Sequence, residues 1–321
     1  MICATTHPLK TPSQFAVWLV LTLLFVTSSG CSVLPAYLEI IPTAQPLSDC
    51  SSDPTLHRKR LALIRFEQPQ ATYHDELAGL SAQFSEQLLQ ALRRSDRFIL
   101  DDLRHATLEP QRIALLGAVE KHNNQQIIDL ASPGGAQLIV QGRFLRFTPE
   151  SQSGFNALLG DPRLNITFEL RIFETIYGTL VSEIQRSYIW HGLSVERPQL
   201  RDSRNYFRGP LQEVLQEMVK DQADLLTRHV SCIPLITPIT VIDDRTLTIN
   251  VGVLRGIRPG DRFKVVHRQF LRIDNDNREH FSDHVVGVLE INRVQADMAQ
   301  GTFLPEGDLF RLQPGDYVRS W

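Results

Sequence analysis

The spacing of apolar residues changes once along the chain, and this change predicts two domains. Residues 58–232 combine segments of helical spacing with segments of strict alternation, whereas residues 233–321 show short alternating segments separated by glycine-rich turns. We therefore expect an α+β fold, in which a mixed α/β sandwich is followed by a small β domain.

In the first domain, residues 60–66 (RLALIRF) predict a strand, and Asp75 is placed to cap a helix that follows it. A short strand over 97–100 and weaker helical pieces between 101 and 133 come next. Pro210 suits the first turn of a last helix, which extends to Val230. The apolar residues of the first helix share one face: Leu77, Leu80, Phe84, Leu88 and Leu92. The apolar stripe of the last helix, from Leu211 to Leu225, is interpreted as core, with a partner groove as the alternative.

Three long strands are predicted over 137–147, 164–175 and 180–190, the last two joined by a hairpin turn at Tyr177-Gly178. In the second of these, apolar residues alternate with Asn165, Thr167, Glu169 and Arg171. This alternation predicts a sheet that is covered on one face and wet on the other.

After residue 233, strands are expected over 246–251, 262–267 and 285–294, with a last one near Tyr317. Two Pro-Gly-Asp triplets, beginning at Pro259 and Pro314, predict tight turns that enter strands. We interpret residues 233–321 as a small SH3-like β-barrel or rolled sheet.

The N-terminus carries an uncharged apolar run over 15–26, after a leader that contains Lys10 and before Ser28-Ser29-Gly30. The run is shorter than the roughly 20 residues of a membrane span, so residues 1–30 are predicted to be a secretory signal peptide. Ser28-Ser29-Gly30-Cys31 resembles a bacterial lipobox, which implies lipidation of Cys31. Cleavage as a soluble periplasmic protein is the alternative.

Residues 31–57 are rich in proline, serine and aspartate and are predicted to be a lipidated tether. Ser32 follows the cysteine, so sorting to the outer membrane is expected. Of the four cysteines, Cys3 lies in the leader and Cys31 would carry lipid. We predict that Cys50 and Cys232 form a disulfide in the oxidising periplasm, with two separate buried thiols as the alternative.

The net charge of −3 is spread without a basic stripe, so no nucleic-acid partner is expected. No motif for a nucleophile, phosphate, dinucleotide or metal stands out, and we predict no enzyme, no catalytic residue, no cofactor and no metal. His280 and His284 lie in a turn-rich polar segment, interpreted as a solvated hairpin tip.

A cluster of arginines and aromatics precedes the last helix of the first domain, and this composition is typical of protein interfaces. A solvated loop is the alternative. The candidate interface comprises Arg201, Arg204, Tyr206, Phe207 and Arg208.

The succession of strand, long helix, Ser95-Asp96-Arg97-Phe98 segment, helix and Ala136-Gln137-Leu138-Ile139 strand resembles the N-terminal domain of TolB and its periplasmic relatives. The Cys232-Ile233-Pro234 junction and the segment from Leu254 to Asp261 (LRGIRPGD) resemble the middle and C-terminal domains of the flagellar assembly protein T family. Members of that family are periplasmic ring components around the flagellar basal body.

The resemblance implies a non-enzymatic periplasmic lipoprotein that acts in the flagellar basal-body ring and helps to dock motor or stator proteins, in a ring-like homo-oligomer. It would lie on the periplasmic face of the outer membrane. The family's extra N-terminal domain has no room before residue 57, and we expect the lipid on Cys31 to replace it as the anchor. The alternative is an outer-membrane lipoprotein that activates a peptidoglycan synthase.

Overall fold

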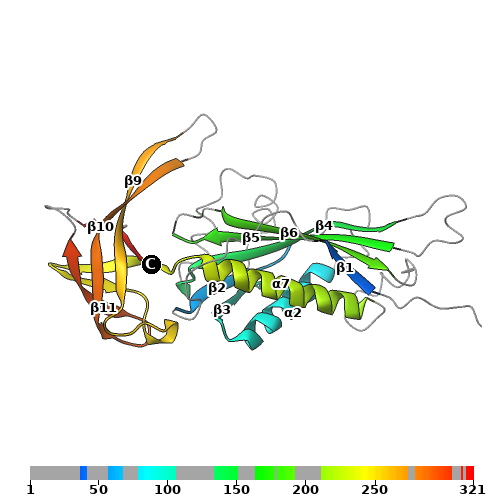
Figure 1. Ribbon diagram of the computed structural model, residues 1–321, viewed down its shortest axis with the longest axis horizontal. Helices are drawn as coiled ribbons and strands as arrows, with labels where there is room; N and C mark the ends of the chain where they lie inside the picture. The colour runs from blue at the N-terminus through cyan, green and yellow to red at the C-terminus, as the bar shows by residue number, and fades with distance from the viewer. Residues whose placement is uncertain are drawn as a thin grey trace, which may run out of the picture.

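The computed structural model describes residues 37–41, 57–67, 79–105, 134–150, 163–176, 178, 180–191, 211–273, 279–305, 312–313 and 316–321. It contains a six-stranded mixed sheet covered on one face by two helices, joined to a closed six-stranded barrel (Figure 1). The α+β class and the small C-terminal barrel predicted from the sequence are confirmed.

The order of strands in the sheet is β1-β6-β5-β4-β2-β3. Strand β2 is parallel to both β3 and β4, whereas the remaining pairs are antiparallel. The strands are β1 (Tyr37–Ile41), β2 (Lys59–Ile64), β3 (Phe98–Leu103), β4 (Leu138–Glu150), β5 (Arg163–Glu174) and β6 (Leu180–His191). The predicted hairpin of the two long strands is confirmed as the antiparallel β5–β6 pair.

Helices α2 (Leu80–Ser95) and α7 (Gln212–Cys232) pack side by side on one face of this sheet (Figure 1). Both place their periodic apolar residues in one core, which confirms the core interpretation of these stripes. Phe84 of α2 packs against Phe144 of β4 and Phe168 of β5, with ring centroids 5.3 and 4.8 Å away. The cap proposed at Asp75 lies outside the described residues.

A polar pair lies within this core, between α7 and β6. The hydroxyl of Tyr188 donates to Asp221 Oδ2 at 2.7 Å and accepts from Gln222 Nε2 at 2.6 Å. Tyr188 and Gln222 are both fully buried. Burial and the neighbouring carboxylate of Asp221 raise the pKa of Tyr188.

On the opposite face of the sheet, the polar residues of β5 are buried rather than wet, so the prediction was wrong for this strand. Thr167, Glu169 and Arg171 of β5 are buried. Arg143 on the neighbouring strand β4 donates through Nε to Glu169 Oε2 at 2.5 Å. Burial is tolerated here because opposite charges meet across the strands and replace contacts with water. Alternation in the sequence shows which residues share a face, but not whether that face is exposed.

The barrel closes in the order β10-β11-β8-β7-β12-β9, with each neighbouring pair hydrogen-bonded. Its core includes Leu247, Val265 and Leu289, all fully buried. Strands β7 and β11 were not among the strands predicted from the sequence. The strands are β7 (Ile236–Asp243), β8 (Thr246–Ile249), β9 (Arg262–Ile273), β10 (Glu279–Val294), β11 (Ala299–Pro305) and β12 (Tyr317–Arg319).

Two further boundaries differ from the predictions. Strand β3 continues to Leu103, where helical pieces were expected to begin at 101, and residues 106–133 lie outside the described part. Tyr37–Ile41, within the predicted tether, forms β1 at the edge of the sheet. This short strand was missed because its five residues are stabilised by pairing with a strand about 150 residues later.

Candidate functional site

The barrel meets the α+β unit at Arg255, the last residue of the short 3₁₀ helix η2 (Val253–Arg255). The side chain of Arg255 is buried, and its Nη2 donates to the backbone oxygen of Gly135 at 2.5 Å. The backbone oxygen of Arg255 accepts from the amide of Arg58 at 2.9 Å. One barrel residue thus bonds to two separate segments of the α+β unit.

Further contacts surround this junction. The side-chain amide of Gln137 donates to the backbone oxygen of Pro234 at 2.7 Å, and the rings of His57 and Phe263 lie 5.4 Å apart. Gly135 has a φ of 65°, a left-handed conformation that favours glycine. The contacts come from two separate segments of the α+β unit, residues 57–58 and 135–137, so they hold the barrel in one orientation.

The junction buries cations, and their pKa values show the cost. Burial lowers the pKa of Lys59 to about 8 and, with the nearby charge of Arg60, that of Arg255 to about 10. The ammonium of Lys59 donates to the backbone oxygen of Ser231 at 3.3 Å, in the last turn of α7, where the helix dipole favours a cation. Arg60 pairs with Asp101 at 2.9 Å. These cations bond to carbonyl and carboxylate oxygens of the protein itself, so their role at the junction is structural.

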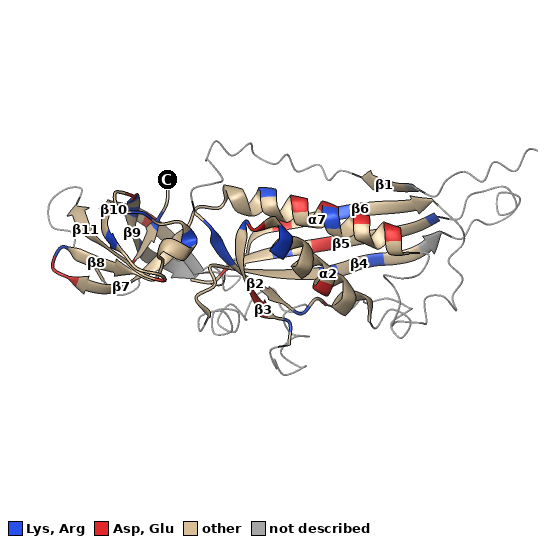
Figure 2. Cartoon of the chain, turned by 90° about the horizontal axis from the view of Figure 1, so that it is seen from below, with Lys and Arg blue, Asp and Glu red and all other residues tan. Residues whose placement is uncertain are grey.

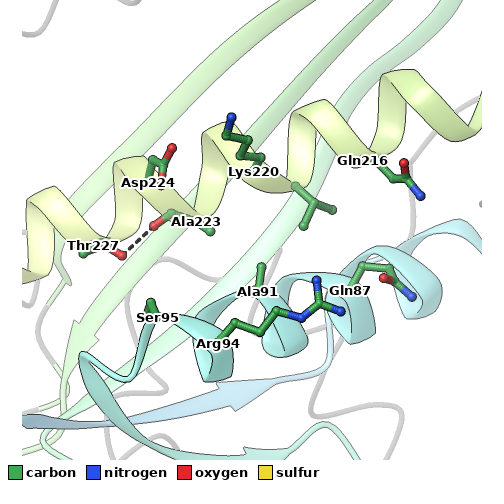
Figure 3. Close-up of a pocket in the computed structure, with 10 residues that line it drawn as sticks. Gln87, Ala91, Arg94, Ser95, Gln216, Lys220, Ala223, Asp224 and Thr227 are labelled. Carbon is green, nitrogen blue, oxygen red and sulfur yellow. Dashed lines mark hydrogen bonds between the residues drawn. The ribbon is translucent and has the colours of Figure 1, made fainter.

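A second feature is a groove of about 520 Å³ between α2 and α7, on their outer faces (Figure 3). Its floor contains small residues spaced four apart on each helix: Ala91 and Ser95 on α2, Ala223 and Thr227 on α7. Because these side chains are short, the two helices leave room between them. Sequence reasoning missed the groove, although the two small-xxx-small pairs were visible in the sequence.

The groove is polar at its rim. Arg94 lies on the α2 side, and Lys220 and Asp224 lie on the α7 side (Figure 3). The hydroxyls of Ser95 and Thr227 donate to backbone oxygens of their own helices, each at 2.7 Å. The rim can therefore form ion pairs and hydrogen bonds with a partner's side chains, and both charge signs are available along the outer helical faces (Figure 2).

Most residues singled out from the sequence lie outside the described part of the chain. This applies to Cys31, to Cys50 and to the whole candidate interface from Arg201 to Arg208. Cys232 ends α7 and is disulfide-bonded. Its pairing with Cys50 stays a prediction.

Within the described ranges, no cluster of three His, Cys, Asp or Glu side chains could hold a metal ion. His280 and His284 belong to strand β10 and not to a hairpin tip as predicted, because β9 and β10 continue their pairing beyond the barrel. Among the helices that the structure describes, none has the length and apolar character to cross a membrane.

In the sequence, Arg255 belongs to a segment that resembles a known family, and no feature of the sequence predicted its role at the junction. A buried arginine next to Gly256 in a turn-rich segment offers no periodic signal. Its function becomes visible only when the structure brings Gly135 within bonding distance.

Comparison with curated proteins gives no match. Among solved structures, a hypothetical protein from Chlamydia trachomatis is 14% identical with a TM-score of 0.37, covering 55% of this chain and 98% of its own. The PelC dodecamer from Paraburkholderia phytofirmans is 13% identical with a TM-score of 0.30, covering 61% and 97%. The C-terminal domain of LpoB from Escherichia coli is 12% identical with a TM-score of 0.25, covering 42% and 86%.

The comparison with protein families is specific to the barrel. The family described as flagellar assembly protein T, C-terminal domain, matches residues 244–320. The match begins at the β7–β8 turn and includes Arg255, the residue that joins the barrel to the sheet. Residues 244–320 therefore resemble the C-terminal domain of flagellar assembly protein T.

Proposed function

We propose that this protein is a non-enzymatic component of the flagellar basal body, which assembles in the periplasm and helps to dock motor or stator proteins. The observation that carries the proposal is the family match over the closed barrel. The order of the elements in the preceding α+β unit, which resembles periplasmic TolB-like domains, is consistent with it.

A docking role needs surfaces held in a fixed relation to each other. The junction at Arg255 supports this requirement, because it bonds the barrel to two segments of the α+β unit. The groove between α2 and α7 supplies a second surface on the same rigid unit. A protein that bridges two partners could use the barrel for one and the helical face for the other.

The proposal includes a lipid on Cys31 that anchors the protein to the periplasmic face of the outer membrane. It also includes the Cys50–Cys232 disulfide, which would tie the N-terminal segment to the end of α7 beside the barrel. Arg201, Arg204, Tyr206, Phe207 and Arg208 are proposed as a further contact surface, since arginine and aromatic residues are enriched at interfaces. A ring of copies would require a heterologous contact that closes on itself.

The decisive experiment is electron microscopy of basal bodies purified from a strain that lacks this protein, together with a swimming assay. We expect loss of a periplasmic ring and of motility. Complementation should succeed with the wild-type chain and fail with a chain that ends at residue 235, before the barrel. Intact basal bodies and normal swimming in the deletion strain would refute the proposed function.

A control variant separates loss of the barrel's role from loss of stability. Arg262 and Glu290 form an exposed ion pair on the barrel, at 2.7 Å. Exposed pairs contribute little to stability, about 0–1 kcal/mol. Arg262→Ala should therefore complement the deletion at normal protein level if the barrel acts as a folded unit.

A further inference from the structure

Strand β1 is bound to the edge of the sheet by pairing and by packing. All five residues pair with β6 in antiparallel register, from Tyr37 opposite His191 to Ile41 opposite Ser187. Leu38 and Ile40 pack against the core of the α+β unit. On the other face, Glu39 Oε2 lies 3.2 Å from His191 Nε2. This segment therefore belongs to the folded domain.

The register places the start of β1 at the end of the sheet remote from the barrel. Tyr37 pairs with His191, the last residue of β6, and Arg163, the first residue of β5, pairs with the same residue. The barrel lies at the opposite end, where Gln137 bonds to Pro234 (Figures 1 and 2). The twelve residues of β6 (Leu180–His191) separate the two ends by about 40 Å.

Without β1, the first residue that the structure describes in the chain would be His57, and its position is very different. The His57 ring lies 5.4 Å from the ring of Phe263 in the barrel. The chain would then enter the folded protein beside the barrel and not at the remote end. Docking of β1 thus decides which end of the molecule receives the chain from the N-terminus.

We propose that β1 is a strap that orients the protein on its membrane, with the barrel directed away from the lipid surface. The inference rests on the proposed lipid at Cys31. Residues 32–36 separate Cys31 from Tyr37 and span at most about 20 Å when fully extended. With β1 undocked, residues 32–49 would allow a reach of up to about 65 Å before the proposed bridge from Cys50 to Cys232, which lies at the end of α7 beside the barrel.

Docking itself is tested by hydrogen exchange on the full mature chain, in detergent. The amides of 37–41 and of their partners 187–191 should be protected in the wild type. Ile40→Asp places a charge against the apolar core and should release 37–41 and those amides of 187–191 that face β1, while the amides that bond to β5 stay protected. Ile41→Asp changes the 41%-exposed neighbour on the other face and should preserve protection. Exchange of 37–41 at the rate of an unstructured peptide in the wild type would overturn the proposal.

Orientation is tested on vesicles carrying the lipidated protein. A donor fluorophore at position 245, in the β7–β8 turn of the barrel, reports its distance from acceptor lipids by energy transfer. We expect low transfer for the wild type and for Ile41→Asp, and a several-fold rise for Ile40→Asp. Equal transfer in all three proteins would refute the orienting role.

These readouts are independent of the flagellar role. A wild-type protein that fails to associate with membranes would refute the lipid anchor, while hydrogen exchange would still decide whether β1 docks. A motility phenotype without a change in energy transfer would retain the proposed function and reject the strap.

Discussion

The Tyr188–Gln222 pair offers a quantitative test of how the helical layer is held to the sheet. Tyr188→Phe removes the hydroxyl that donates to Asp221 and accepts from Gln222, at 2.7 and 2.6 Å. Gln222 is fully buried, so its amide would lose its partner inside the core. A buried polar group left without a partner costs about 1–3 kcal/mol, and we expect Tyr188→Phe to lower the free energy of unfolding by about 2 kcal/mol.

Gln222→Leu should behave differently, although it breaks the same hydrogen bond. The amide oxygen Oε1 of Gln222 is buried and has no hydrogen-bond partner among the described residues. Leucine of similar volume removes that unsatisfied group, while the Tyr188 hydroxyl still donates to Asp221. We expect a change of less than about 1 kcal/mol, in either direction.

The double variant decides between the two effects. Once Gln222 is leucine, removing the Tyr188 hydroxyl no longer leaves a buried amide without a partner. The double variant should therefore lose less free energy of unfolding than the sum of the two single variants, by about 1–2 kcal/mol. Urea unfolding at constant pH, followed by circular dichroism and analysed for a constant m-value, measures all four proteins. Strict additivity, or a Tyr188→Phe variant as stable as the wild type, would refute the reasoning.

Three further predictions concern the junction, the barrel and the groove. Burial lowers the pKa of Lys59 from 10.5 to about 8, so between these pH values the unfolded chain binds more protons than the folded chain. The free energy of unfolding should therefore rise with pH over this interval, and Lys59→Met should lose this rise in urea titrations. A Cβ at position 252 would clash with the backbone oxygen of Gln295, so Gly252→Ala should lower the unfolding free energy by about 1–3 kcal/mol in thermal or urea unfolding, and an unchanged midpoint would contradict this. Arg94→Glu at the groove rim should impair swimming at normal protein level, whereas Arg93→Glu, exposed but outside the groove, should swim normally; equal swimming would argue against the groove as a docking surface.

Much of the element order followed from the sequence because long elements carry a periodic signal. Helix α2 has apolar residues at helical spacing, and the core packs them as expected, from Leu80 to Leu92. The β5–β6 hairpin followed from two long alternating runs around Gly178, whose φ of 64° suits the turn. Local patterns suffice where the element is long and its turn is short.

The short strands were not predicted from the sequence because partners distant in the chain stabilise them. Strand β1 has five residues and, within the described sheet, pairs only with β6, while β7 and β11 are fixed by closure of the barrel. The polar face of β5 was assigned to solvent because the sequence does not reveal that Glu169 meets Arg143 across two strands. Pairing between residues distant in the sequence determines both where the short strands form and whether the polar face of β5 is buried.

The candidate site was the least predictable part. Arg255 bonds to Gly135, 120 residues earlier in the chain, and neither residue carries a motif for such a contact. The groove depends on the angle and spacing at which α2 and α7 pack, which small residues permit but do not specify. The Arg255–Gly135 contact and the groove both depend on how segments distant in the sequence pack in three dimensions.

The edge position of β1 has a consequence for the order in which the sheet folds. Residues 37–41 are synthesised early, yet their only strand partner in the described sheet, β6, follows about 150 residues later. Chains emerge from the N-terminus, so β1 must remain unpaired until β6 has formed. The sheet therefore acquires its first strand as one of its last folding steps.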